Sequence, residues 1–140
     1  MGKKCYAAID IGSNAARLLI KREEENENLV SRKLAKVLLL RVPLRLGFDV
    51  FALGKLSDER MEKMLRLMKA YRQLMKIYEV TDYRACATSA MRDAKNGKAV
   101  INKILKQTGI HIEIIDGQEE AQMIYNNHVE DLQDRTGNYL

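Results

Sequence analysis

Apolar runs of different lengths mark where this chain is expected to form strands and helices. Apolar residues dominate Cys5–Ile11 and Ala16–Arg22, and the small polar residues between these runs predict the turn of a β-hairpin. A third strand is expected to begin near Leu29, to include Val37–Leu40 and to end before Pro43, because proline cannot donate to a strand ladder. The remaining short apolar runs predict two further strands, Tyr83–Ala87 and His111–Ile115.

The longest helix is expected from Ser57 to about Glu79. Ser57 is a favourable N-cap, and Asp58 and Glu59 follow in the first turn, where the helix dipole stabilises acids. Apolar residues then recur at steps of three and four: Met61, Met64, Met68, Tyr71, Met75 and Tyr78. This stripe is expected to face the core, and a methionine face that binds a partner is the less favoured alternative.

The other connections are expected to be shorter. The segment Leu44–Leu56 carries two glycines and predicts an irregular loop. One helix is expected from Thr88 to the Asn96-Gly97 break, and a second from Lys98 to Gln107, closed by Gly109. A final helix is expected from Asp116. With the two helices on either side of the Asn96-Gly97 break counted as one helical stretch, the expected order is βββαβαβα, which predicts an α/β fold with a mixed five-stranded sheet and helices on both faces.

Composition and charge narrow the class of protein. The 140 residues suit one domain, and no apolar run is long enough to span a membrane. The 24 basic residues exceed the 19 acidic ones, and eight of the basic residues lie between Arg17 and Arg45. Such a basic region favours a polyanionic partner. A nucleic acid is an unlikely one, because the aromatic residues form no stacking arrangement among the basic ones. Cys5 and Cys86 are interpreted as buried free thiols of a cytoplasmic protein.

The hairpin carries the candidate chemistry. Asp10 is a lone acid in an apolar strand, which is costly unless it is paired or holds a cation. In the turn that follows, Gly12, Ser13 and Asn14 can direct successive backbone N–H groups at an anion, because glycine and asparagine tolerate left-handed angles. The interpretation is a phosphate-binding hairpin with Mg²⁺ held by Asp10. An ordinary hairpin whose Asp10 caps its own turn is the alternative.

Two later stretches add candidate residues. Thr88 and Arg92 follow the strand Tyr83–Ala87, and ligands of open α/β sheets lie beyond strand carboxyl ends. A forked guanidinium suits phosphate oxygens, although a capped helix with a solvent-facing arginine is the alternative. In the final expected helix, Glu119 completes a capping box with Asp116, which leaves Glu120 without a local partner. Both acids could also serve only to complement the helix dipole.

These stretches together resemble a known family. The pattern D-x-G-S-N-x-x-R-L, spelled by Asp10, Gly12, Ser13, Asn14, Arg17 and Leu18, is similar to the first phosphate motif of the exopolyphosphatase/guanosine pentaphosphate phosphohydrolase (Ppx/GppA) family. RVPLRLGFDVFALGKLSDE, ATSAMRDAKNG and IEIIDGQEEA also resemble it, in the family's order. The resemblance covers nearly the whole chain. It implies a ribonuclease-H-like lobe of the actin, sugar kinase and heat-shock ATPase superfamily.

The resemblance also implies an activity and its residues. Terminal orthophosphate would be released from polyphosphate or guanosine pentaphosphate by attack of water that Glu120 activates. Gly12, Ser13, Asn14, Arg17, Thr88 and Arg92 would bind phosphate, and Asp10 would hold Mg²⁺. Arg17 could instead brace the hairpin.

The family's second phosphate motif, D-x-G-G-G-S-T-E, is not found in this sequence. Residues 1–140 are therefore expected to form a single N-terminal lobe of a two-lobe phosphatase, inactive alone, whose full-length form is a homodimer. Two alternatives are a regulatory module that binds polyphosphate or guanosine penta- and tetraphosphate without hydrolysing it, and an ATP-dependent kinase or ATPase of the same superfamily.

Overall fold

A computed structural model describes residues 4–24 and 33–116 of the chain. Its elements are β1 (Cys5–Ile11), β2 (Ala15–Glu24), β3 (Lys33–Pro43), α1 (Leu46–Leu53), α2 (Asp58–Ile77), β4 (Asp82–Ala87), α3 (Ser89–Asp93), α4 (Gly97–Thr108) and β5 (Ile112–Ile114). The mixed five-stranded sheet expected from the sequence is confirmed, with strand order β3-β2-β1-β4-β5.

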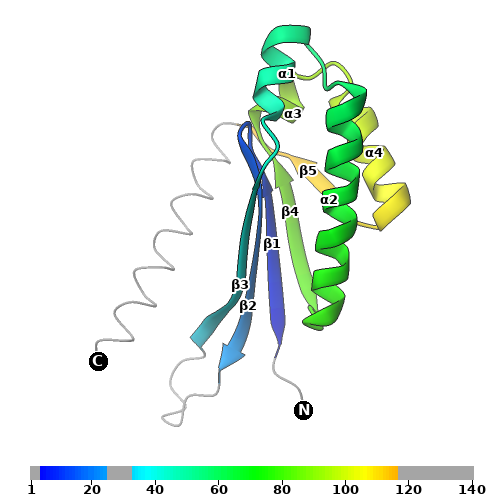
Figure 1. The fold of residues 1–140 in the computed structure, drawn as a ribbon. Coiled ribbons are helices and arrows are strands. Elements are labelled where there is room, and N and C mark those ends of the chain that lie inside the picture. The colour runs from blue at the N-terminus through cyan, green and yellow to red at the C-terminus, as the bar shows by residue number, and fades with distance from the viewer. Residues whose placement is uncertain (1–3, 25–32, 117–140) are drawn as a thin grey trace, which may run out of the picture.

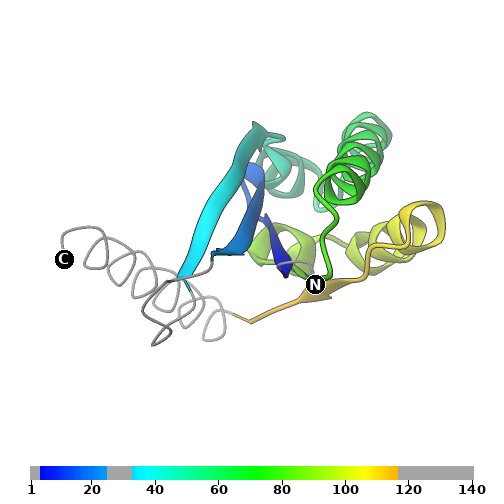
Figure 2. The same cartoon turned by 90° about the horizontal axis from the view of Figure 1, so that it is seen from below.

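The sheet is antiparallel on one side and parallel on the other. β1 pairs antiparallel with β2, and β2 with β3, whereas β4 pairs parallel with both β1 and β5. Helices α2 and α4 lie on the same side of the sheet, and α1 and α3 lie at the end where β1 and β4 finish (Figures 1 and 2). The helix expected from Asp116 onward falls outside the described residues. Within the described part of the chain, no helix is long and apolar enough to cross a bilayer.

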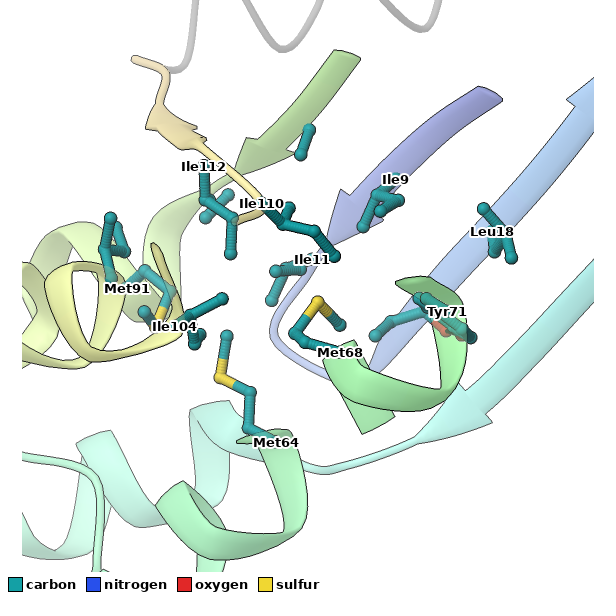
Figure 3. Packing of buried hydrophobic residues seen from close by; sticks show 14 of the residues in the cluster. Ile9, Ile11, Leu18, Met64, Met68, Tyr71, Met91, Ile104, Ile110 and Ile112 are labelled. Atoms are coloured by element: carbon teal, nitrogen blue, oxygen red, sulfur yellow. Dashed lines mark hydrogen bonds between the residues drawn. The ribbon is translucent and has the colours of Figure 1, made fainter. Parts of the chain in front are cut away.

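The core lies between the sheet and α2 with α4. Side chains of β1 alternate, so that Ile9 and Ile11 face this core, and the register places Leu18 of β2 opposite Ile9 on the same face. The apolar stripe of α2 packs against them, with Met64 and Met68 fully buried (Figure 3). Full burial of such a side chain contributes about 1.5–3 kcal/mol. The expectation of a core-facing stripe is confirmed.

Tyr71 ties α2 to the second strand of the hairpin. Its side chain is 1% exposed, and its hydroxyl donates to the Ala16 carbonyl at 3.0 Å. Burial raises the pKa of the Tyr71 phenol to about 12, so that the hydroxyl keeps its proton and remains a donor at neutral pH. The long helix is thereby fixed close to the β1–β2 turn.

The loop expected at Leu44–Leu56 is wrong, because α1 occupies most of it. Apolar periodicity does not predict this helix, because two of its aromatic side chains are exposed and its acid is buried. Phe48 is 68% exposed and Phe51 94% exposed, whereas the acid Asp49 is 7% exposed. Besides the polar contacts of Asp49, only Leu46, which is fully buried, and the partly buried Val50 anchor the helix to the core. The element order over the described residues is βββααβααβ, and α1 is the one helix in it that the expected order βββαβαβα lacks.

Smaller differences concern strand and helix ends. Pro43 is the last residue of β3 rather than lying beyond it. The missing donor is tolerated because β3 is an edge strand of the sheet. Residues 25–32, which include the expected start of this strand, lie outside the described part. Ser57 caps α2 as expected, since its Oγ accepts from the Arg60 N–H at 3.2 Å. Gly109 ends α4 with a φ of 78°.

Candidate functional site

The β1–β2 turn is short. The Gly12 N–H donates to the Ala15 carbonyl at 2.9 Å, which leaves Ser13 and Asn14 at the two central positions. Positive φ angles among the described residues occur only at Arg45, Glu79, Gly54 and Gly109. The expectation that left-handed angles shape this turn is therefore wrong. The Gly12 N–H is already engaged within the hairpin, whereas the N–H groups of Ser13 and Asn14 have no backbone acceptor in the described part of the chain.

The segment before α1 holds the carbonyl side of the turn. The N–H groups of Leu44 and Arg45 donate to the Asn14 carbonyl at 3.0 and 2.9 Å, and the Gly47 N–H donates to the Ser13 carbonyl at 2.8 Å. In a trans peptide the C=O and the next N–H point in opposite directions. Because the Ser13 carbonyl points at α1, the N–H of Asn14 is directed away from α1. The turn thus presents a fixed donor on its outer side.

Gly47 is needed for this approach. A Cβ added at Gly47 would lie 3.0 Å from the Ser13 Cβ, closer than ordinary contact. Arg45, immediately before α1, has a φ of 54°. A non-glycine residue in this region stores backbone strain, and such strain concentrates at functional sites. The sequence does not reveal this contact, because it joins residues more than thirty positions apart.

A buried polar network fixes the start of α1 and α2. Asp49 accepts hydrogen bonds from the Ser57 N–H at 3.0 Å, the Ser57 hydroxyl at 2.5 Å and the Arg60 Nε at 2.6 Å. Burial by itself would raise the pKa of Asp49, but the hydrogen bonds from Ser57 and Arg60 outweigh it and hold that pKa below its usual value. Arg60 also donates to the Leu44 carbonyl. This bond links the network to the segment before α1, whose N–H groups donate to the turn.

The end of β4 meets the turn from the other side. The Thr88 N–H donates to the Ile11 carbonyl at 3.0 Å, and the Thr88 hydroxyl donates to the same carbonyl at 3.4 Å. Thr88 makes no side-chain capping bond to α3, contrary to the expected capping role. The next residue, Ser89, places its hydroxyl 2.9 Å from the Ser13 hydroxyl. Sequence reasoning missed Ser89; its one signal is its position in the ATSAMR stretch.

Asp10 and Arg17 form an ion pair on the face of the sheet opposite α2. They are directly opposite in the β1–β2 register, and Arg17 Nη2 lies 2.7 Å from Asp10 Oδ2. Their side chains are 27% and 43% exposed. This contact agrees with the bracing role considered for Arg17. It also satisfies the requirement that an acid in an apolar strand be paired.

The fit of a magnesium ion depends on Asp10. In residues 4–24 and 33–116, no group of three or more acidic, histidine or cysteine side chains could hold a metal. Mg²⁺ usually takes one or two carboxylates and completes its shell with water and substrate phosphates. Asp10 fits this mode of Mg²⁺ binding, because only its Oδ2 contacts Arg17 and its Oδ1 lies outside that contact. Asp10 could therefore hold Mg²⁺ together with a phosphate substrate, and the ion would neutralise phosphate charge.

Arg92 lies at the same end of the sheet, but part of its guanidinium already contacts other residues of the chain. Its Nη1 donates to the Ile115 carbonyl at 2.9 Å, and its Nε is 3.9 Å from Asp93 Oδ1. The guanidinium thus ties α3 to the residue after β5, and its other N–H groups remain available for a ligand. Phosphate binding by Arg92 stays a prediction. Glu120 lies outside the described residues.

Gly12 is the position that the fold explains least. A Cβ at Gly12 would meet only the Ala15 carbonyl oxygen, at 3.5 Å, which is ordinary contact. The φ angle is not in the left-handed region. Neither packing nor backbone conformation in the described structure requires a glycine here. A glycine beside the outward N–H group of Asn14 instead leaves room for a ligand to approach the backbone.

The fold defines an α/β lobe, and its β1–β2 turn lies at the ends of β1 and β4 with two N–H groups that have no backbone acceptor among the described residues. A model of the Ppx/GppA phosphatase family matches residues 8–139, and the chain belongs to this family. The family is one of phosphatases, which supports a phosphohydrolase kind of function. The match also confirms the resemblance carried by the sequence motifs.

Individual relatives agree with this assignment. The chain is 38% identical over 119 residues to the bifunctional 3-dehydroquinate synthase/phosphatase of Fusobacterium nucleatum, a match that covers 82% of this chain and 18% of the relative. The crystal structure of the Aquifex aeolicus Ppx/GppA family member is 30% identical with a TM-score of 0.76, over 84% of this chain and 37% of that one. An exopolyphosphatase from Cytophaga hutchinsonii is 28% identical with a TM-score of 0.75, over 85% and 36%. The chain thus spans little more than a third of these structural relatives.

Proposed function

We propose that this chain is the N-terminal lobe of a Mg²⁺-dependent phosphohydrolase that releases terminal orthophosphate from polyphosphate or guanosine pentaphosphate. The observation that carries the proposal is the β1–β2 turn. In residues 4–24 and 33–116, two N–H groups without a backbone acceptor lie next to a glycine that neither packing nor backbone conformation requires. Such an arrangement binds a phosphate through backbone donors. Family membership supports the phosphohydrolase kind of function.

The roles of the residues follow from their chemistry. The N–H groups of Ser13 and Asn14 bind one phosphate, and the Ser13 hydroxyl, paired with Ser89, lies next to them. Arg17 and Arg92 neutralise phosphate charge, with Thr88 holding the end of β4 against β1. A bound Mg²⁺ held by Asp10 would supply further charge neutralisation. Phosphoryl transfer depends mainly on such positioning and charge neutralisation.

In the proposed reaction, a water oxygen attacks the terminal phosphorus and the bridging P–O bond breaks. The water proton passes to the carboxylate of Glu120, orthophosphate leaves, and the shortened chain keeps the bridging oxygen. The role of Glu120 rests on its match to the family's G-x-E-E-A pattern. We further propose that a second lobe completes the site, that the full-length protein is a homodimer, and that it acts in the cytoplasm.

The test is orthophosphate release from long-chain polyphosphate with Mg²⁺. The 140-residue chain is compared with a two-lobe polypeptide that carries it as the first lobe, and with that polypeptide bearing Glu120→Gln. We expect release only from the unmutated two-lobe form, and a drop of at least a hundredfold on substitution of the base. If the two-lobe form binds polyphosphate without releasing phosphate, the hydrolase proposal fails and a sensor replaces it. Turnover by the 140-residue chain would contradict the need for a second lobe.

A further inference from the structure

A row of side chains crosses the sheet beside the β1–β2 turn, on the face opposite α2. The strand registers place Asp10 opposite Arg17, and Arg17 opposite Arg41 of β3. Directly opposed residues of adjacent strands share one face, with Cβ atoms about 4.5–5.5 Å apart. The row therefore begins next to Gly12 and ends at the outer edge of the sheet with Arg41.

The charge of this row is unbalanced. Two arginines face each other across β2 and β3, an arrangement that destabilises a sheet unless an anion compensates it. Asp10 supplies one carboxylate, and its Oδ2 is bound to Arg17 at 2.7 Å. Arg41 is exposed, and no acid or acceptor accompanies it in the described part of the chain. The structure of residues 4–24 and 33–116 thus leaves one guanidinium of the pair uncompensated.

Protection of an edge strand explains only part of this arrangement. A charge on β3 discourages pairing with another chain, and a lysine anywhere on the strand would serve this purpose. It does not explain an arginine placed opposite a second arginine. The planar guanidinium fork binds phosphate oxygens in pairs, which a lysine cannot do. The registers place Arg17 between Asp10 and Arg41, so a phosphate chain laid along this row from the turn would pass Arg17 before Arg41.

We propose that Arg41 is a substrate-binding residue that holds an inner phosphate of a polyphosphate chain. Together with Arg17 it selects chains of several phosphates over orthophosphate. This inference rests on the proposed phosphohydrolase function and adds a length preference to it. Orthophosphate, bound at the turn, does not extend to Arg41 and gains nothing from it.

The test is calorimetric titration of the 140-residue chain with orthophosphate and with tripolyphosphate. The variants are Arg41→Gln and Arg66→Gln. Arg66 is a matched control because it is an exposed arginine on α2, with a side chain 77% exposed, so that both variants lose one positive charge. Arg41→Lys, which keeps the charge and removes the fork, is the conservative variant.

We expect Arg41→Gln to weaken tripolyphosphate binding about tenfold, as for a lost hydrogen bond to a charged group, and to leave orthophosphate binding unchanged. Arg41→Lys should fall between this variant and the unmutated chain, and Arg66→Gln should match the unmutated chain. Equal effects of Arg41→Gln and Arg66→Gln, or equal losses for both ligands, would overturn the role of Arg41 alone. Failure of the unmutated chain to bind either ligand would overturn phosphate binding at the turn, and this inference with it.

Discussion

Two glycines of this lobe, Gly97 at the junction of α3 and α4 and Gly12 in the β1–β2 turn, differ in what the fold demands of them. A Cβ at Gly97 would lie 2.1 Å from the Met91 carbonyl oxygen, a separation that backbone atoms cannot tolerate. A Cβ at Gly12 would lie 3.5 Å from the Ala15 carbonyl oxygen, in ordinary contact. Packing explains the first glycine completely. Nothing in residues 4–24 and 33–116 explains the second, and we attribute it to a ligand that approaches the turn.

The contrast separates stability from binding. Around Gly97 the chain is packed against itself, and any added atom must displace backbone. Around Gly12 the hairpin is closed by its own hydrogen bond, and the N–H groups of Ser13 and Asn14 have no backbone acceptor among the described residues. Substitutions in the two regions should therefore affect different measurements.

The largest expected effect on stability is that of Gly97→Ala. We expect the free energy of unfolding to fall by about 3 kcal/mol, because α4 must move away from α3 to admit the methyl group. Urea denaturation measures this change. Lys98→Ala, at the exposed neighbouring position, is the control and should change the free energy of unfolding by less than about 0.5 kcal/mol. A loss below about 1 kcal/mol for Gly97→Ala would show that the junction can relax.

A smaller loss of stability, coupled to binding, is expected from Asp49→Ala. This change removes the acceptor of three hydrogen bonds and leaves Arg60 without its partner, at a cost of about 2 kcal/mol. It should also weaken phosphate binding, because the same network positions the segment that holds the turn. Denaturation and tripolyphosphate titration of the same variant check both expectations.

The stability of the fold should depend on pH through Asp49. Its pKa is lower in the folded protein than in the unfolded chain, so the stabilisation is complete above the unfolded value of about 3.9. It is lost as pH falls below that value through the folded pKa. The stability difference between the unmutated chain and Asp49→Asn should therefore shrink in acid. A difference that stays constant from neutral pH into this acid range would contradict a titrating Asp49.

The neighbouring helices α1 and α2 show what the sequence could and could not predict. The cap at Ser57 and the buried stripe through Met64, Met68 and Tyr71 made α2 predictable, because local propensity and burial agree there. In α1 they disagree: Phe51 is exposed and Asp49 is buried. The position of α1 is set by the buried Leu46 and by the contacts of Asp49 with Ser57 and Arg60, and no apolar periodicity encodes the latter.

The sequence predicted which residues belong to the candidate site, but only part of how they contact one another. Motif spacing placed Asp10, the Gly12–Asn14 turn and Thr88 at one end of the sheet, because β1 and β4 finish there together. The Asp10–Arg17 pair depends on strand register, and the bond from Arg92 to the Ile115 carbonyl depends on how α3 meets β5. Such contacts between distant segments are fixed by tertiary packing rather than by local sequence.

The smallest expected effect on stability and the most direct test of the account come from one variant, Gly12→Ala. The Ser13 and Asn14 N–H groups are claimed to bind phosphate, and a methyl group at position 12 should obstruct that approach while leaving the hairpin intact. Gly109→Ala is the matched control. It also adds one methyl group, with no heavy atom within 4 Å, but at a φ of 78° that costs about 1 kcal/mol in stability.

Calorimetric titration of tripolyphosphate in the presence of Mg²⁺, with a denaturation curve for each protein, is the deciding measurement. The account predicts that Gly12→Ala unfolds within about 1 kcal/mol of the unmutated chain and binds tripolyphosphate at least tenfold more weakly. Gly109→Ala should be less stable and bind normally. Unchanged affinity in a folded Gly12→Ala chain would contradict a phosphate site at the β1–β2 turn.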